Sequence, residues 1–259
     1  MNAGFVAGTL VHTDRGLVPI QNLQVGDLVW SKSLKENTES LKAIQNVSTI
    51  QNAEIWKVEY LPSVGSEDEY LLFVGSDTYI WVNGDAEGYE GTKIGWTKAD
   101  DEMQTSSSVN LIGVNIGVIS HTTPTFNTHL KNVAFTVDTW DSTPELLIDF
   151  NANNQSYFMF DLFDQVYFAQ NFPTMAQGTI YVDGDDIEES GYIYNNDFKF
   201  DKYPLVAKFI QNFIDGKSQQ RQGFFTTTTY QLEIADNHNY FVGNLGVLVG
   251  DSTIQGNVE

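Results

Sequence analysis

The feature that most constrains this chain is the length of its apolar runs, which over residues 1–100 is that of short strands. The strand-like runs are rich in apolar and β-branched residues and comprise Phe5–His12, Ile55–Tyr60, Tyr70–Val74 and Tyr79–Val82. Gly16 marks a turn, and Gly26-Asp27 precedes the apolar run Leu28-Val29-Trp30. Short strands at spacings of about ten residues are typical of an all-β sandwich or barrel-like domain.

The middle of the chain, residues 109–225, is less distinctive. Val133–Val137 and Ser156–Phe163 have the composition of further strands. A helix is predicted over residues 204–215, because Pro204 suits a first helical position and apolar residues then recur at helical spacing until Gly216. We expect this region to pack on the domain, since its many aromatic side chains would be costly to expose together. The strand pattern returns at Thr226.

Composition excludes several kinds of chemistry. The chain has 259 residues, 41% of them hydrophobic and 13% aromatic, which is enough for a packed core. It has no cysteine, so disulfides, thiolate metal sites and a cysteine nucleophile are excluded. The formal net charge of −21 disfavours nucleic acid and anionic membranes as partners. Such a surface suits a basic protein partner, or solubility alone.

No targeting signal is recognised. No apolar run approaches the roughly 20 residues of a membrane helix. The segment Met1–Phe5 lacks a basic stretch before an apolar one, which a signal peptide requires. The sequence therefore predicts a cytoplasmic chain as expressed, or one exported as part of a larger system.

Two motif blocks at opposite ends carry a family resemblance. The first comprises residues 4–13, 16–20 and 25–29, and the last comprises residues 229–234, 236–243 and 246–249. Together they resemble the first and last blocks of a Hint domain, the module shared by inteins, hedgehog autoprocessing domains and bacterial polymorphic toxins, and are most similar to the toxin type. Residues 73–82 and Gly95-Trp96-Thr97-Lys98-Ala99-Asp100 resemble the middle block of that type.

The resemblance implies an all-β, horseshoe-shaped, intein-like fold as a single domain over residues 1–259. Residues 4–103 would hold the N-terminal blocks and residues 226–251 the C-terminal block. Residues 104–225 would be an insertion of extra strands and the one helix. Such a fold would bring Gly4 and Asp251 close together.

The chemistry of the family explains which residues it needs. A first-position Cys or Ser attacks the preceding carbonyl and converts the amide into a thioester or ester. A Thr and a His of the middle block distort and protonate that amide. At the far end an Asn, assisted by a preceding His, attacks its own carbonyl, and the fold supplies the proximity.

In this sequence most of the reactive positions have changed. The positions carried over from the family are Gly4 for the nucleophile, Gly75 and Thr78 for the middle-block Thr and His, Gly250-Asp251 for the terminal His-Asn pair, and Asp236 and His238, which match the pattern. Gly4 has no nucleophilic side chain. The resemblance therefore implies a domain without active catalytic residues, metal or cofactor, acting as a structural or interaction module in a toxin-type system.

Two alternatives stay open. Asp251 precedes Ser252 and can cyclise in place of Asn, with His238 as the base that Gly250 lacks, which would give residual C-terminal self-cleavage and release of a toxin. The acidic charge also fits an immunity-like protein that binds a basic toxin domain.

Other candidate residues have simpler explanations. We expect His12 to be a partly buried strand residue, and His121 and His129 not to bind metal. The acidic run Asp183–Glu189 lacks the ligand spacing of an EF-hand and suggests a solvated turn. Gly216-Lys217-Ser218 lacks the earlier glycine of a phosphate-binding loop, so Gly216 is interpreted as a helix C-cap.

Overall fold

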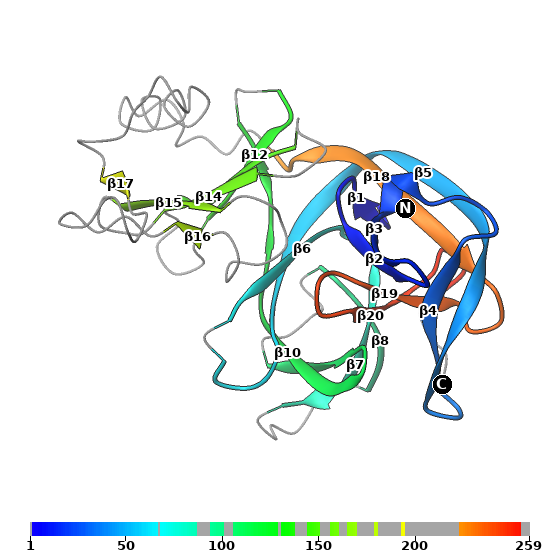
Figure 1. Cartoon of the computed structure of the whole chain (residues 1–259). Helices are drawn as coiled ribbons and strands as arrows, with labels where there is room; N and C mark the ends of the chain where they lie inside the picture. Colours follow the sequence, from blue (N-terminus) through cyan, green and yellow to red (C-terminus); the bar gives the residue numbers. More distant parts are fainter. Residues whose placement is uncertain are drawn as a thin grey trace. The chain divides into compact units, whose positions relative to one another are not determined.

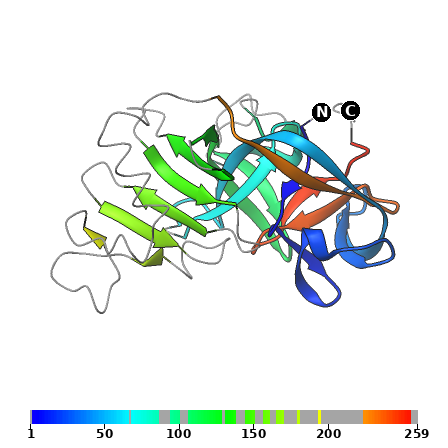
Figure 2. The ribbon, with the colours of Figure 1, turned by 90° about the horizontal axis from the view of Figure 1, so that it is seen from above.

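The longest strand, β5 (Thr38–Leu61), carries neighbours along its whole length. Its first residues, Thr38 to Ala43, pair with β4 (Leu28–Ser33), β18 (Thr226–Ile234) pairs from Ile44 to Glu54, and its last part pairs with β6 (Tyr70–Gly75). Figure 1 shows β5 in blue beside β18 in orange, and Figure 2 shows the same two strands from above. Residues far apart in the sequence therefore meet on one strand.

The computed structural model describes residues 2–66, 68–86, 94–100, 106–128, 131–137, 144–150, 156–160, 165–169, 179–180, 193–194 and 223–254. The chain forms two compact units. One comprises Met1–Thr123 with Thr226–Glu259, and the other comprises Pro124–Phe225.

The first unit is built on one 13-stranded sheet, in the order β10-β9-β7-β20-β19-β2-β4-β5-β18-β1-β6, with β3 on β2 and β8 on β7. The remaining strands are β1 (Phe5–Val6), β2 (Leu10–Thr13), β3 (Gly16–Pro19), β7 (Tyr79–Asp85), β8 (Ile94–Lys98), β9 (Ser107–Leu111), β10 (Val114–Pro124), β19 (Asn239–Val242) and β20 (Val247–Gly250), and a 3-10 turn covers Ile20–Asn22. Because β10 and β6 also pair with β5, the sheet closes on itself.

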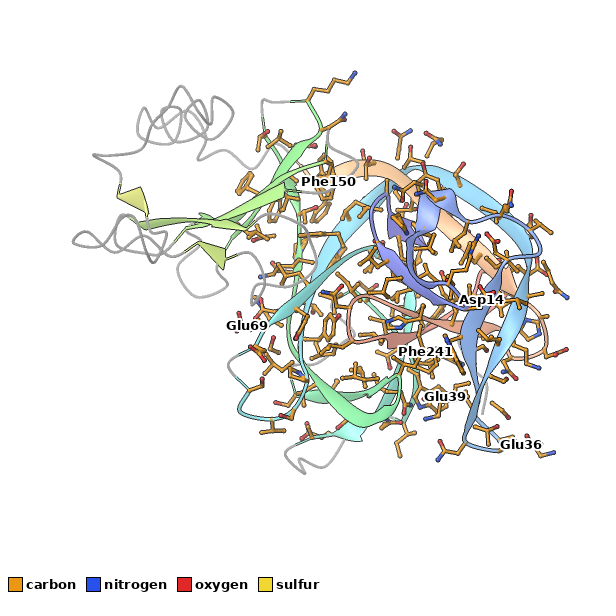
Figure 3. All side chains as sticks on the ribbon, in the orientation of Figure 1. Asp14, Glu36, Glu39, Glu69, Phe150 and Phe241 are labelled. Atoms are coloured by element: carbon orange, nitrogen blue, oxygen red, sulfur yellow. The ribbon has the colours of Figure 1, made fainter. Side chains whose placement is uncertain are left out.

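Alternating side chains of this sheet fill one apolar core. Val11, Val29, Ile44, Val58 and Leu232 are each almost fully buried. They come from strands of the first blocks and of the last block, so neither end of the chain can form this core alone. Figure 3 shows Phe241 of β19, also fully buried, within the first unit.

The second unit contains a 7-stranded antiparallel sheet, in the order β11-β12-β13-β14-β15-β16, with β17 on β15. Its strands are β11 (Phe126–Asn127), β12 (Val133–Val137), β13 (Pro144–Asp149), β14 (Ser156–Phe160), β15 (Gln165–Ala169), β16 (Thr179–Ile180) and β17 (Ile193–Tyr194). Phe150 stacks on Phe225 with ring centroids 4.9 Å apart, which ties the end of this unit to its sheet.

The prediction of a mainly β fold is confirmed. Strands β9 and β10 belong to the sheet of the first unit, so the second unit begins at Pro124 rather than at residue 104. The predicted helix at 204–215, the acidic run at 183–189, the 216–218 segment and His129 lie outside the described residues. Within the described ranges, no helix has the length and apolar character needed to cross a membrane.

Candidate functional site

One pocket of the first unit gathers residues from both terminal blocks and the middle block. It encloses about 380 Å³ and is lined by Ala3, Gly4, Phe5, Asp77, Thr78, Tyr79, Lys98, Gln231, Tyr240, Gly250, Asp251, Ser252 and Ile254. The expected proximity of Gly4 and Asp251 is thus confirmed. Strand β1 creates it, because Phe5 pairs with Tyr230 of β18 on one side and with Val74 of β6 on the other.

The peptide bond between Ala3 and Gly4 is held on both sides. The Gly4 N–H donates to Thr78 Oγ1 at 2.9 Å, and the Thr78 hydroxyl donates to the Gly4 carbonyl at 3.1 Å. The Ala3 carbonyl accepts a 2.6 Å hydrogen bond from Thr229 Oγ1, and Thr229 is fully buried. An amide whose N–H and C=O are both satisfied in a buried site is stabilised in its planar ground state.

Thr78 stands where the family resemblance places an imidazole. A threonine hydroxyl stays protonated at ordinary pH and offers one weakly acidic proton, which here faces the Gly4 carbonyl. It therefore holds the amide without being able to protonate its nitrogen as a leaving group.

The backbone leaves no room for side chains at the two glycines. Gly4 has φ +95°, and a Cβ there would lie 2.5 Å from the Tyr230 carbonyl oxygen. A Cβ on Gly75 would lie 2.7 Å from the carbonyl carbon of Asn2. The N-terminal segment thus packs on Gly75 at a distance that only glycine permits.

Asp77 and Lys98 form an ion pair at the rim of the pocket. Lys98 Nζ lies 3.0 Å from Asp77 Oδ1, and both side chains are about one-third exposed, at 31% and 29%. Burial alone would raise the pKa of Asp77, but the Asn2 N–H and the Lys98 ammonium together hold it below its usual value. The hydrogen bond to Asp77 raises the pKa of Lys98. The pair fixes Asn2 beside the middle block.

At the other end, the Asp251 carboxylate is fully buried and has several donors. Oδ2 accepts the Ile234 N–H at 2.9 Å and faces His238 Nδ1 at 3.2 Å. Oδ1 accepts the Thr253 N–H at 2.8 Å and its hydroxyl at 2.6 Å. These bonds hold the carboxylate in a turn and lower its availability for attack on its own carbonyl.

His238, Asp251 and Thr253 do not form a relay of the serine-protease kind. Thr253 Oγ1 and Asp251 Oδ2 both face Nδ1 of His238, at 3.1 and 3.2 Å. A relay needs the acid and the nucleophile on opposite ring nitrogens. The His238 backbone has φ +54°, and its side chain is 47% exposed.

The aromatic wall of the pocket is Tyr240. Its side chain is nearly fully buried, and its ring packs edge-on against Phe5 at 6.1 Å. Desolvation, with a smaller effect of the nearby Asp251 charge, raises the pKa of this phenol far above its usual value. Tyr240 is therefore a neutral phenol across the working pH range.

Two other candidate residues, Asp236 and His12, do not line the pocket. Asp236 is exposed and pairs with Lys42 at 2.7 Å, which lowers its pKa. His12 lies 2.8 Å from the Gly243 carbonyl, and burial lowers its pKa, as expected for a partly buried strand residue. Among the described residues no group of three or more His, Cys, Asp or Glu side chains could hold a metal ion.

Four residues of the site are not predicted from the sequence: Thr229, Asp77, Lys98 and Thr253. Thr229 and Lys98 stand inside the quoted motifs, but nothing in the sequence indicates that the first meets Ala3 across 226 residues. Burial along β18 does not follow a regular alternation, since Thr229, Leu232 and Ile234 are its buried residues, so the strand pattern gives no signal for Thr229.

Comparison with known proteins gives matches among solved structures only, because no family model and no curated protein matches the chain. A bacterial intein-like domain from Clostridium thermocellum matches at 14% identity and a TM-score of 0.48, covering 97% of this chain and 99% of that one. The Ssp DnaB mini-intein variant M86 matches at 7% identity and a TM-score of 0.42, covering 99% and 98%. A DnaB intein from Synechocystis sp. PCC 6803 matches at 7% identity and a TM-score of 0.43, covering 96% and 99%. These are inteins and intein-like domains, the class that the terminal motifs resemble.

Proposed function

We propose that this chain is a Hint-type domain whose self-cleavage chemistry is lost. More particularly, it serves as a structural or interaction module in a bacterial polymorphic-toxin system. The observation that carries the proposal is the buried clamp on the Ala3–Gly4 peptide, in which Thr78 and Thr229 satisfy the amide and Gly4 offers no attacking atom. Amide-to-ester rearrangement needs a nucleophile within reach of the carbonyl, and the backbone at Gly4 excludes one.

Thiol challenge tests this proposal. The chain is extended at its N-terminus by a marker protein and incubated with a strong thiol or with hydroxylamine, which cleave esters and thioesters. We expect the intact mass to stay unchanged. Release of a marker ending at Ala3 would overturn the proposal.

A second candidate function is residual cleavage after Asp251. It is favoured by one observation, the 3.2 Å contact between His238 Nδ1 and the Asp251 carboxylate. The three other hydrogen bonds to that carboxylate oppose it. The variant Asp251→Asn distinguishes residual cleavage from no cleavage. It would accelerate cleavage after residue 251 if that reaction survives, whereas we expect no fragment from the wild type or from the variant.

The interaction role rests on charge. A formal net charge of −21 favours a basic protein partner, such as a toxin domain, and this includes the immunity-like alternative. Co-purification with the products of neighbouring genes tests it. We expect any complex to weaken as salt rises, because exposed charges are screened.

A further inference from the structure

Lys32 meets a carboxamide rather than a carboxylate, which distinguishes it from three other lysines of the first unit. Its Nζ lies 3.0 Å from Asn110 Oδ1, whereas Lys42, Lys57 and Lys98 contact Asp236, Glu59 and Asp77. A carboxylate repels nucleophilic attack by its negative charge, but a carboxamide carbon is an acyl group that an amine can attack.

The carboxamide is held in one orientation. Asn110 is only 6% exposed, and its Nδ2 donates to Asn83 Oδ1 at 3.1 Å. Asn83 Oδ1 also accepts the Trp81 indole N–H at 2.9 Å, which fixes Asn83 in turn. The amide nitrogen therefore points toward Asn83 and the carbonyl toward the lysine amine.

A glutamate lies across the strand pair from Lys32. Glu39 is directly opposite Lys32 in the antiparallel register of β4 and β5, so the two side chains share a face. Glu39 Oε1 also accepts the Gly113 N–H at 3.3 Å, in the turn that follows Asn110 on β9. Figure 3 shows Glu39 on the β4–β5 hairpin, with Glu36 at its tip. Lys32 and Asn110 thus meet where two hairpins adjoin, and Glu39 is the strand residue opposite Lys32.

We propose that Lys32 and Asn110 join in an intramolecular isopeptide bond, with Glu39 as the proton carrier. Glu39 takes a proton from the Lys32 ammonium, and the free amine attacks Cγ of Asn110. The new Nζ–Cγ bond forms, one proton of the attacking amine passes to Nδ2, and the Cγ–Nδ2 bond breaks to release ammonia. The proton held by Glu39 then passes to the ammonia, which departs as ammonium, so the charge of the lysine leaves with it and no oxidant or other reactant is needed.

Such a bond would covalently link β4 and β9, which are not adjacent in the sheet order. Between β9 and β4 in the sheet lie β7, β20, β19 and β2, and 78 residues separate the two side chains along the chain. In a chain without cysteine, this would be a covalent closure of the sheet that no disulfide supplies.

Intact mass of the purified full chain tests the bond. We expect the wild type to lack one ammonia from the mass that its sequence gives, and a protease digest to yield one branched peptide containing Lys32 and Asn110. Lys32→Arg and Glu39→Gln should show the full mass, and Lys42→Arg, a lysine of the same hairpin, should lack the ammonia as the wild type does.

Two outcomes overturn the proposal. Full mass in the wild type means that the contact is only a hydrogen bond. Loss of ammonia that persists in Lys32→Arg, and yields fragments with hydroxylamine, assigns it to a succinimide at Asn83-Gly84 instead. Because the wild-type mass alone decides the first case, the test does not depend on whether any variant folds.

Discussion

Gly4 and Gly75 lack reactive side chains, and the structure leaves no space for such side chains at either position. Each stands at a position where the family resemblance places a hydroxyl or thiol, and at each the backbone of another segment occupies the space of a Cβ. A reactive side chain therefore cannot be restored by a single substitution without moving β18 in the case of Gly4, or the segment Asn2–Ala3 in the case of Gly75. Since catalytic groups act as a unit, one restored group would also bring little activity.

The first prediction concerns Gly4→Cys. We expect no thiol-dependent cleavage, and a loss in the free energy of unfolding of about 2 kcal/mol or more from the clash with the Tyr230 carbonyl and the positive φ. Gly16→Cys is the matched control, because Gly16 has φ +91° but open space around it. Urea unfolding of both proteins measures the difference, and equal losses would show that the clash is absent.

The second prediction concerns the buried pair of Lys57 and Glu59. Lys57 Nζ lies 3.0 Å from Glu59 Oε2, and the two side chains are only 2% and 14% exposed. Glu59→Gln removes the carboxylate charge 3.0 Å from a buried ammonium, so we expect a loss of about 3–5 kcal/mol in the free energy of unfolding. Asp236→Asn, which removes the partner of Lys42 in a pair whose carboxylate is 71% exposed, should cost far less, because solvent screens an exposed pair.

The same pair gives a pH dependence. Burial alone would raise the pKa of Glu59, but the Lys57 ammonium and the Ser120 hydroxyl outweigh it and the pKa is lowered. A carboxyl whose folded pKa lies below the unfolded value of about 4.3 stabilises the fold above that pH and ceases to do so as pH falls through the folded pKa. Unfolding of Glu59→Gln should therefore depend less on pH in the acid range, and an unchanged slope would contradict this role.

Strand β1 has only two residues, and side-chain hydrogen bonds hold Ala3 and Gly4, which precede it. Thr78→Val removes the acceptor for the Gly4 N–H and the donor to the Gly4 carbonyl. We expect a loss of about 1–3 kcal/mol and faster hydrogen exchange at the Gly4 amide. Thr228→Val, which removes an exposed hydrogen bond to Gln51, should leave that amide unchanged.

The strands show what the sequence can and cannot predict. The expected strands at 70–74, 79–82 and 133–137 correspond to β6, β7 and β12, because each is a short apolar run bounded by turn residues. The 24-residue length of β5 was not predicted. The alternation of buried and exposed side chains along β5 is interrupted where the paired strand changes from β4 to β18 and where Asn52 has φ +57°. Pairing with the distant strands β18 and β6 is what extends β5 to its full length.

Some residues of the candidate site could be predicted from the sequence, and others could not. The resemblance placed Gly4, Thr78 and Asp251 together, since motif order in a known fold carries spatial information. The roles of Thr229 and Thr253 come from hydrogen bonds that depend on the folded backbone, and a threonine alone gives no signal for them. Asp236 matched the motif yet lies exposed outside the pocket.

At the scale of the whole molecule, the buried core residues of the first unit, among those that the structure describes, run up to Ile119 and resume at Leu232. Thr125 and Phe225, at the two ends of the second unit, are joined by a 2.8 Å backbone hydrogen bond. We therefore predict that replacing residues 126–224 by a short glycine-serine linker leaves the first unit folded, with cooperative unfolding and the near-ultraviolet signal of a packed core. Loss of cooperative unfolding would show that the first unit depends on the second.

The loss of self-cleavage is tested most directly by the mass of the full chain with a marker protein at each end. The mass is followed for days near neutral and mildly acidic pH. Gly4 offers no nucleophile, Thr78 no imidazole, and Asp251 a carboxylate held by neighbouring donors. We expect a single species of unchanged mass, with no splicing and no release of either marker. A fragment ending at Asp251 that persists in Asp251→Asn and vanishes in Asp251→Ala would contradict this expectation and establish a residual C-terminal protease.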